Sequence, residues 1–199
     1  PEANSFGSAV SGGAAMTFLG SPRPAASDSY IASQPLPTFN SAGAIGVVPG
    51  YTSIGNQWMV SAVVVMPEGG VTDEAVLLDI RTDGTAARWL VRYDTSGAAG
   101  QLRLQVLDVD GADLLNTTQD FDIDDKPFLL YVEGGNNGSN ALWTLGCAPV
   151  LDMSTVPSVS APSGIITSAS APRVTRVGVG TGVNLNNDIA IGHVAVYGA

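Results

Sequence analysis

The chain has 199 residues, with 8 Lys and Arg residues against 18 Asp and Glu residues and a formal net charge of -10. A chain of this length buries roughly 70% of its unfolded surface, so one domain needs no disulfide or metal. The negative charge repels phosphate backbones and anionic membrane surfaces. Nucleic acid is therefore excluded as a partner.

Cys147 is the only cysteine, which excludes an internal disulfide and a cysteine-based zinc site. The stretch from residue 29 to residue 67 has no charge, but Pro35, Pro37 and Pro49 interrupt it. A bilayer helix needs about 20 nearly continuous apolar residues, so we expect no membrane insertion. The N-terminus shows no basic cluster before an apolar run, so no signal peptide is expected in the chain as given.

Residues 1–57 are rich in Ser, Ala, Gly and Pro and predict an irregular N-terminal arm with one to three edge strands. Residues 58–199 then repeat short alternating or β-branched apolar runs, separated by Gly, Asp or Asn turns. The predicted strands are Trp58 to Met66, Ala75 to Thr82, Ala86 to Tyr93, Gln101 to Val109, Ala112 to Thr118, Pro127 to Val132, Ala141 to Leu145, Val174 to Val179 and Ile189 to Tyr197. No stretch has the period of a long amphipathic helix, so the sequence predicts an all-β, antiparallel sandwich of two sheets.

Two connections are informative. Asp110 and Gly111 form a strong two-residue hairpin signal. The uncharged segment from Met153 to Pro172 predicts a long surface excursion within the domain, because strands follow it.

Three phrases of this part of the chain resemble a known family. Lys-Pro-Phe-Leu-Leu-Tyr-Val-Glu-Gly-Gly and Ala-Leu-Trp-Thr-Leu-Gly, between Lys126 and Gly146, are similar to a strand and hairpin of the laminin G-like branch of the concanavalin A-like lectin/glucanase superfamily. Arg176 to Gly180 and Ile189 to Tyr197 resemble its last two strands. The resemblance implies a jelly roll of two packed sheets. It also implies glycan or protein binding, in a family often appended to bacteriophage tail proteins.

Residues that commonly perform catalysis are scarce. His193 is the only histidine and lies inside the last predicted strand, and Cys147 has no evident base partner. We expect a structural or surface role for His193 and a buried, apolar role for Cys147.

Glycosidases of this superfamily place paired carboxylates on one strand face. Glu74 and Asp79 are five residues apart, which puts them on opposite faces of a regular strand. Hydrolase activity is therefore disfavoured, and we expect no catalytic residue.

Two polar segments offer oxygen ligands suited to Ca²⁺. One is the acidic run from Asp120 to Asp125, and the other contains Asn184, Asn186, Asn187 and Asp188. Neither matches an EF-hand, and Asn also favours turns because it tolerates a left-handed backbone. A solvated turn is thus the alternative interpretation of each, and we expect no required cofactor.

The most suggestive candidate site is basic. Arg81, Arg88, Arg92 and Arg103 fall opposite the apolar positions of three successive predicted strands, so they form a patch if those strands are neighbours. Arginine forks suit carboxylates, phosphates and sugar hydroxyls; a mixed-charge solvent face is the alternative. The tryptophans Trp58, Trp89 and Trp143 favour the core, with Trp143 the best candidate for a sugar contact.

These observations lead to three functional hypotheses. The preferred one is a non-enzymatic virion component, on a phage tail or surface, that binds a host envelope glycan or neighbouring subunits. A secreted or cell-surface glycan-binding module is the first alternative, and a degenerate glycoside hydrolase is the second. Exposed strand edges in a virion are normally paired or covered, so a homo-oligomer is expected.

Overall fold

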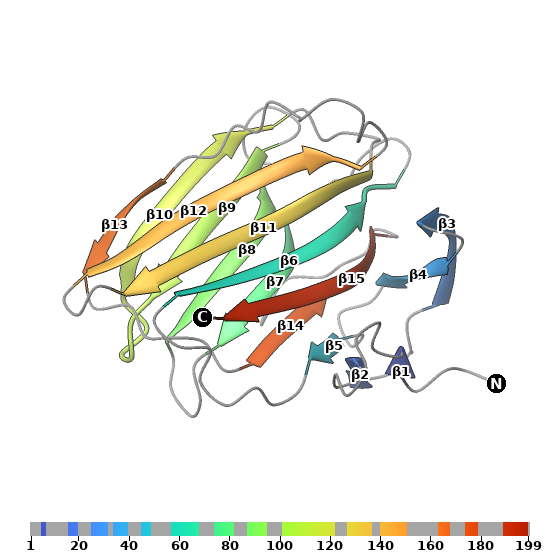
Figure 1. The fold of residues 1–199 in the computed structure, drawn as a ribbon, viewed down its shortest axis with the longest axis horizontal. Helices are drawn as coiled ribbons and strands as arrows, with labels where there is room; N and C mark the ends of the chain where they lie inside the picture. Colours follow the sequence, from blue (N-terminus) through green and yellow to red (C-terminus); the bar gives the residue numbers. More distant parts are fainter. Residues whose placement is uncertain are drawn as a thin grey trace.

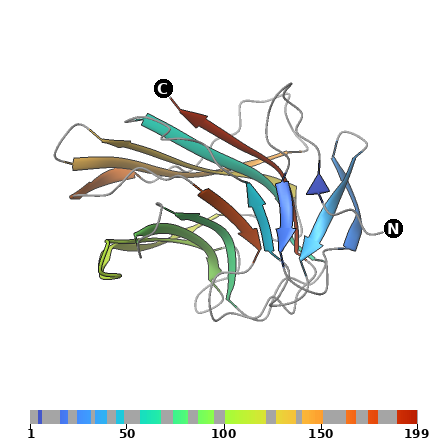
Figure 2. The same ribbon diagram turned by 90° about the horizontal axis from the view of Figure 1, so that it is seen from below.

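The computed structural model describes residues 5–6, 16–19, 25–31, 34–39, 45–48, 57–67, 74–81, 87–94, 101–121, 127–136, 140–150, 163–167, 174–178 and 189–198. These residues form strands and turns, and the strands assemble into two antiparallel sheets. The sheets stack as the two layers of a β-sandwich (Figures 1 and 2). The predicted all-β jelly-roll class is therefore confirmed.

Sheet A contains eight strands and sheet B seven. In spatial order sheet A is β1 (Ser5–Phe6), β2 (Met16–Leu19), β5 (Ile45–Val48), β14 (Val174–Gly178), β7 (Ala75–Arg81), β8 (Arg88–Asp94), β9 (Gln101–Leu107) and β10 (Asp113–Asp120). Sheet B is β13 (Ser163–Thr167), β12 (Asn140–Pro149), β11 (Pro127–Asn136), β6 (Gln57–Val65), β15 (Ile189–Gly198), β4 (Gln34–Phe39) and β3 (Ala25–Ile31). The chain changes sheet several times, as in jelly rolls.

Strands also occur where the sequence signals for them are weak. Residues 1–57 contribute β1 to β5, more than the one to three edge strands expected, and β2, β4 and β5 lie inside the sheets. β13 lies within the segment expected to be a surface excursion, and it pairs with β12. These runs are short or broken by Pro and Gly, so pairing with a neighbouring strand decides them rather than propensity. The division at residue 57 stays a prediction.

The core lies between the sheets and is almost entirely apolar. Trp58 of β6 and Trp89 of β8 meet there edge to face, with ring centroids 4.8 Å apart, and so connect the two layers. Trp143 and Cys147 of β12 are also buried in this core. The predictions for the tryptophans and the cysteine are confirmed. Burial raises the pKa of the Cys147 thiol to about 12, which keeps it protonated and unreactive at neutral pH.

A β-bulge in β7 changes which residues share a face. The pairing with β8 shifts between Val76 and Leu78, so Leu77 and Leu78 both enter the core. Val76 instead packs with Leu90 and Leu107 on the outer face of sheet A. Regular alternation would instead have placed Val76 on the same face as Leu78.

The same bulge overturns an argument about carboxylates. Glu74 and Asp79 lie on the same, outer face of sheet A, where both contact arginines of that face. The expectation that they lie on opposite faces assumed a regular strand. Their spacing in the sequence therefore does not exclude a carboxylate pair, and their positions and partners on this face must be considered instead.

The predicted hairpin between β9 and β10 is present, with a different turn centre. The Asp108 carboxylate accepts hydrogen bonds from the backbone N–H groups of Asp110 and Ala112, at 2.9 Å each. Gly111 has φ 83°, a left-handed conformation that glycine adopts without steric cost. Val109 and Asp110 thus occupy the tip, and Gly111 follows it as the left-handed residue of a three-residue loop.

Candidate functional site

The two outer faces of the sandwich differ in chemistry, and each is a candidate site. On sheet A, β7, β8 and β9 are neighbours, so the four arginines singled out in the sequence lie together. Arg81 is the register partner of Arg88, and Arg92 is the register partner of Arg103. Like charges directly opposite one another destabilise a sheet unless counter-charges lie between them.

Carboxylates supply those counter-charges. Asp79 accepts from Arg81 at 2.6 Å, Glu74 accepts from Arg92 at 3.0 Å, and Arg103 contacts both Glu74 at 3.7 Å and Asp94. Asp79 and Asp94 are buried, and the paired guanidinium groups are only partly exposed. Among the described side chains, the face expected to be a cationic patch is thus an ion-pair layer, in which four arginines face three carboxylates. That these arginines bind a ligand stays a prediction.

Some buried polar atoms of this layer are incompletely satisfied. Oδ1 of Asp79 and Nε of Arg92 have no hydrogen-bond partner in the structure as described. Beneath them lies the apolar cluster of Val76, Leu90 and Leu107. The aliphatic stems of Arg88 and Arg92 flank Leu90 on β8 and can cover it, which explains how an outer-face leucine is buried.

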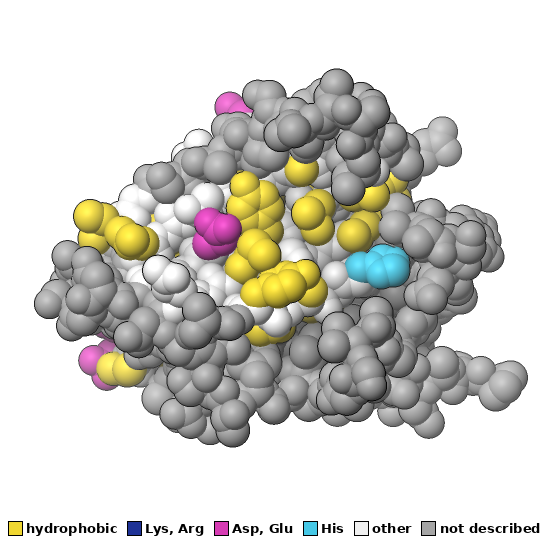
Figure 3. Space-filling view, viewed as in Figure 1, with side chains coloured by type: hydrophobic (Ala, Val, Ile, Leu, Met, Phe, Trp, Pro, Cys, Tyr) yellow, Lys and Arg dark blue, Asp and Glu magenta, His cyan; other side chains and the backbone are white. Residues whose placement is uncertain are grey.

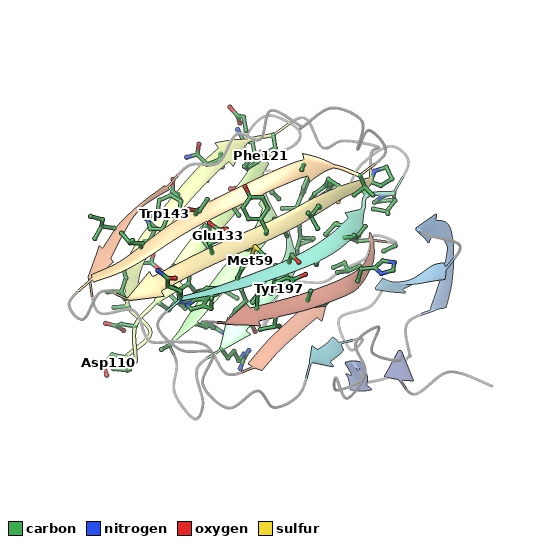
Figure 4. All side chains as sticks on the ribbon, viewed as in Figure 1. Met59, Asp110, Phe121, Glu133, Trp143 and Tyr197 are labelled. Carbon is green, nitrogen blue, oxygen red and sulfur yellow. The ribbon has the colours of Figure 1, made fainter. Side chains whose placement is uncertain are left out.

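The outer face of sheet B carries a groove. Its volume is about 500 Å³, and β6, β11, β12 and β15 provide its walls. The lining residues are Gln57, Trp58, Met59, Glu133, Gly134, Gly135, Leu142, Trp143, Thr144 and Tyr197. Figure 4 shows Met59, Glu133 and Tyr197 on the side of the ribbon that faces the viewer.

Register explains why the face is hollow at this point. Tyr197, Met59, Glu133 and Thr144 are successive partners across β15, β6, β11 and β12, so their side chains form one row. The adjoining row has Gly135 between Gln57 and Leu142. Because Gly135 has no side chain, a gap opens between its two neighbours.

Glycines on the other face of these strands let two indoles pack closely. A Cβ at Gly134 would overlap the indole of Trp58, and a Cβ at Gly164 would lie 2.7 Å from Nε1 of Trp143. Both indoles are buried in the core. Trp143 is a lining residue of the groove because β12 forms one of its walls, but its ring is not exposed there. The sequence singled out Trp143 together with the arginines, but the two lie in different sheets and cannot form one site.

A third glycine supports an aromatic platform beside the groove. The Tyr131 ring lies over Gly146, where a Cβ would overlap the phenol. Tyr131 is two residues from Glu133 on β11, so both are on the outer face. Burial, and then the charges of Glu133 and Cys147, raise the pKa of Tyr131. The phenol therefore covers Gly146 and stays partly exposed on the outer face.

Sequence reasoning missed the groove residues Tyr197, Glu133, Met59 and Thr144. One signal was available, because alternation along β11 places Tyr131 and Glu133 on the face opposite Leu130 and Val132. What the sequence could not show is the lateral order of β15, β6, β11 and β12, which brings residues 59, 133, 144 and 197 together.

The remaining candidates give little chemistry. His193 is exposed on the same side of sheet B (Figure 3), at a bulge of β15 and with φ 47°. The proposed metal ligands Asn184, Asn186 and Asp188 lie outside the described residues, as does most of the acidic run 120–125. Within the described part no group of three metal-ligating side chains occurs, and no helix there is long and apolar enough to cross a membrane.

No protein-family model matches the chain, and no curated protein matches it in sequence. Solved structures do resemble it in fold. They include the enzymatically active domain of tailspike protein 2 from bacteriophage CBA120 (TM-score 0.57, 13% identity) and the binding domain of botulinum neurotoxin serotype D (0.55, 11%). A third is an alginate lyase from Alteromonas sp. 272 (0.50, 13%).

The three matches differ in how much of the other protein they include. The tailspike, toxin and lyase matches cover 91%, 94% and 96% of this chain. This chain spans only 28% of the tailspike chain and 43% of the toxin chain, but 97% of the lyase chain. At such low identity the likeness shows the jelly-roll fold and no shared activity. The three neighbours include a binding domain, a tailspike domain and a lyase, so the fold leaves the function to be argued from the site.

Proposed function

We propose that this chain is a saccharide-binding module that uses the sheet B groove and does not turn over its ligand. The observation that carries the proposal is the groove of about 500 Å³, in which an exposed tyrosine and a methionine lie beside polar side chains on rigid strands. Ligand sites are typically concave, mostly apolar and fitted with a few convergent polar groups.

The lining suits a sugar ring in particular. Tyr197 is 54% exposed and offers an aromatic face to the C–H side of a pyranose. Glu133 can accept hydrogen bonds from hydroxyls, while Thr144 and Gln57 can both donate and accept. Tyr131, whose phenol covers Gly146, extends this surface along β11 and β12. A saccharide longer than one unit would therefore find contacts beyond the groove.

Binding without hydrolysis follows from the carboxylates. A glycosidase needs two carboxyl groups about 5 to 9.5 Å apart across the bond that breaks. Among the described lining residues Glu133 is the single carboxylate. Glu74 and Asp79 share a face, but that face belongs to sheet A and both are held by arginines. A degenerate hydrolase therefore remains the weaker alternative.

The setting we propose is a virion surface, where the module adheres to a host envelope glycan. The laminin G-like resemblance of residues 126–146, 176–180 and 189–197 and the fold likeness to a phage tailspike domain support this setting. A secreted glycan-binding module is the alternative. Antibodies against the chain that label purified phage particles would support the first, and labelling confined to secreted cell material would contradict it.

The groove itself is tested by filling it. Gly135→Val places a β-branched side chain, which strands accept, between Gln57 and Leu142. We expect saccharide binding, measured by titration calorimetry with oligosaccharides identified on a glycan array, to weaken at least tenfold. The matched control is Thr118→Val on the exposed outer face of sheet A, which should leave binding unchanged. Full binding by Gly135→Val would contradict the proposal.

The outer face of sheet A supports a second candidate function, docking to a neighbouring subunit. Its partly exposed arginines are of the residue type enriched at protein interfaces, and they lie together on neighbouring strands. Replacing Arg92 and Arg103 by Ala should then lower the oligomeric state in analytical ultracentrifugation. A chain that sediments as a monomer before the change would contradict this role.

A further inference from the structure

We infer that the sheet B groove selects uncharged saccharides and rejects those that carry carboxylate or sulfate groups. The inference rests on the proposed function, since it names the ligand class of the same groove. It goes beyond that function because glycan binding alone does not specify the charge of the sugar.

The first argument is the charge of the groove. Glu133 is its one ionisable carboxylate, and it is exposed in the middle of the row that Tyr197, Met59 and Thr144 complete. Figure 3 shows mainly apolar and uncharged side chains among the described residues of this face, and no Lys or Arg among them. An anionic sugar placed here would meet a like charge with no described cation to offset it.

The second argument is the position of the arginines. Every described Lys or Arg side chain belongs to β7, β8 or β9 of sheet A, on the outer face. Stacked sheets are about 10 Å apart, and side chains on opposite outer faces are further apart still, beyond the screening length of physiological salt. Arg81, Arg92 and Arg103 are also paired with carboxylates of their own face. They cannot neutralise a ligand in the groove.

The third argument is that the field of Glu133 acts along the face. Its charge contributes to the raised pKa of Tyr131, the platform tyrosine beside the groove. A negative potential that disfavours a phenolate disfavours a uronate carboxylate for the same reason.

The experiment compares sugars that differ at C6, where a hydroxymethyl group in one member of a pair is replaced by a carboxylate in the other. The probes are galactose and galacturonate oligomers of equal length and linkage, together with mannose and mannuronate oligomers, titrated into the full chain by calorimetry at low salt. We expect the neutral member of a pair to bind about tenfold more tightly, the effect of one uncompensated charge at short range. Added salt should narrow this ratio, because it screens exposed charges.

Glu133→Gln isolates the cause. This variant keeps the shape of the side chain and removes its charge, while an NH2 donor replaces one acceptor oxygen, so the neutral-to-uronate ratio should fall to about two or less. The matched control is Glu74→Gln, which removes one carboxylate charge from the opposite face and should leave the ratio as it was.

Each outcome decides something. Uronates that bind as tightly as their neutral counterparts, or a ratio that Glu133→Gln does not change, would overturn the inference while the saccharide-binding function stands. If none of the four oligomers binds, and the glycan array is also negative, the proposed function fails and the inference falls with it. Binding that Gly135→Val does not affect would place the sugar elsewhere and overturn both.

Discussion

The two outer faces of this sandwich are both formed by antiparallel strands, but their charged side chains are arranged differently. Sheet A presents four arginines and buries the carboxylates Asp79 and Asp94 among them. Among its described side chains, sheet B presents aromatic and small groups around one exposed groove carboxylate, Glu133, and it is hollowed where Gly135 lies. The first face is a closed layer of charges paired with one another, and the second is an open, nearly uncharged surface.

The difference separates charge from binding capacity. A cluster of arginines suggests a ligand site, but in sheet A the guanidinium groups already have partners, and a ligand would have to displace them. On sheet B the groups that a sugar would contact are exposed and unengaged by ion pairs in the described structure. Substitutions on the outer face of sheet A should therefore change the free energy of unfolding, and substitutions on the outer face of sheet B should change saccharide binding.

The largest expected effect is on the stability of sheet A. Asp79→Ala removes a buried carboxylate and leaves Arg81 without its ion-pair partner. We therefore expect the free energy of unfolding, measured by urea denaturation, to fall by on the order of 3 kcal/mol. Saccharide binding should not change in the folded variant. A variant that keeps its stability but loses binding would reverse the roles assigned to the two faces.

Cys147, in the core between the two sheets, gives a prediction for the pH dependence of stability. In the folded chain the pKa of Cys147 is raised from 9.0 to about 12, so the unfolded chain releases this proton first as the pH rises. The stabilisation is complete below about pH 9 and should be lost toward about pH 12, in the same direction as the smaller contribution of Tyr131.

Unfolding free energies measured at about pH 8 and about pH 10.5 should therefore differ by on the order of 2 kcal/mol through this thiol. In Cys147→Ala the fall with pH should be correspondingly shallower, although the variant is less stable throughout. An unchanged slope would show that the thiol does not contribute.

On sheet B the aromatic side chain at the groove should dominate binding. Tyr197→Ala removes the exposed ring and should weaken saccharide binding about tenfold, or about 1.4 kcal/mol, in calorimetric titration. Because Tyr197 is half exposed, stability should change little. Arg92→Ala is the control on the opposite face, and an equal loss of binding there would remove the distinction between the faces.

The Tyr131 platform is tested through the residue beneath it. Gly146→Ala introduces a Cβ that overlaps the phenol, so the ring must move off the strand. We expect binding of longer oligosaccharides to weaken about threefold, with monosaccharide binding unchanged. Equal effects on short and long ligands would indicate that Tyr131 lies within the groove site rather than beside it.

The smallest effect concerns the limit of the binding face. His193 has φ 47°, which costs about 1 kcal/mol for a residue with a Cβ, so His193→Gly should stabilise the chain by a few tenths of a kcal/mol. Thermal unfolding would measure this change. Binding should be retained, and its loss would show that the saccharide surface extends along β15 to this residue.

The sequence alone predicted most strands between residues 58 and 199, because alternation and turn residues are local signals. It also placed the arginines on one face of three strands, the tryptophans in the core and Cys147 among apolar neighbours. It failed at the bulge of β7, where one extra residue sends Leu77 and Leu78 to the same side and brings Glu74 and Asp79 together. The alternation of apolar and polar residues does not predict where such a bulge occurs.

Sequence by itself thus determined the fold class, because the alternation of apolar side chains requires two sheets that bury one face each. Only the tertiary structure decided the site. The order of β15, β6, β11 and β12 brings together side chains from residue 57 to residue 197, and the glycine gap between Gln57 and Leu142 exists only across strands. Alternation acts along one strand, whereas a groove depends on neighbours that are distant in the chain.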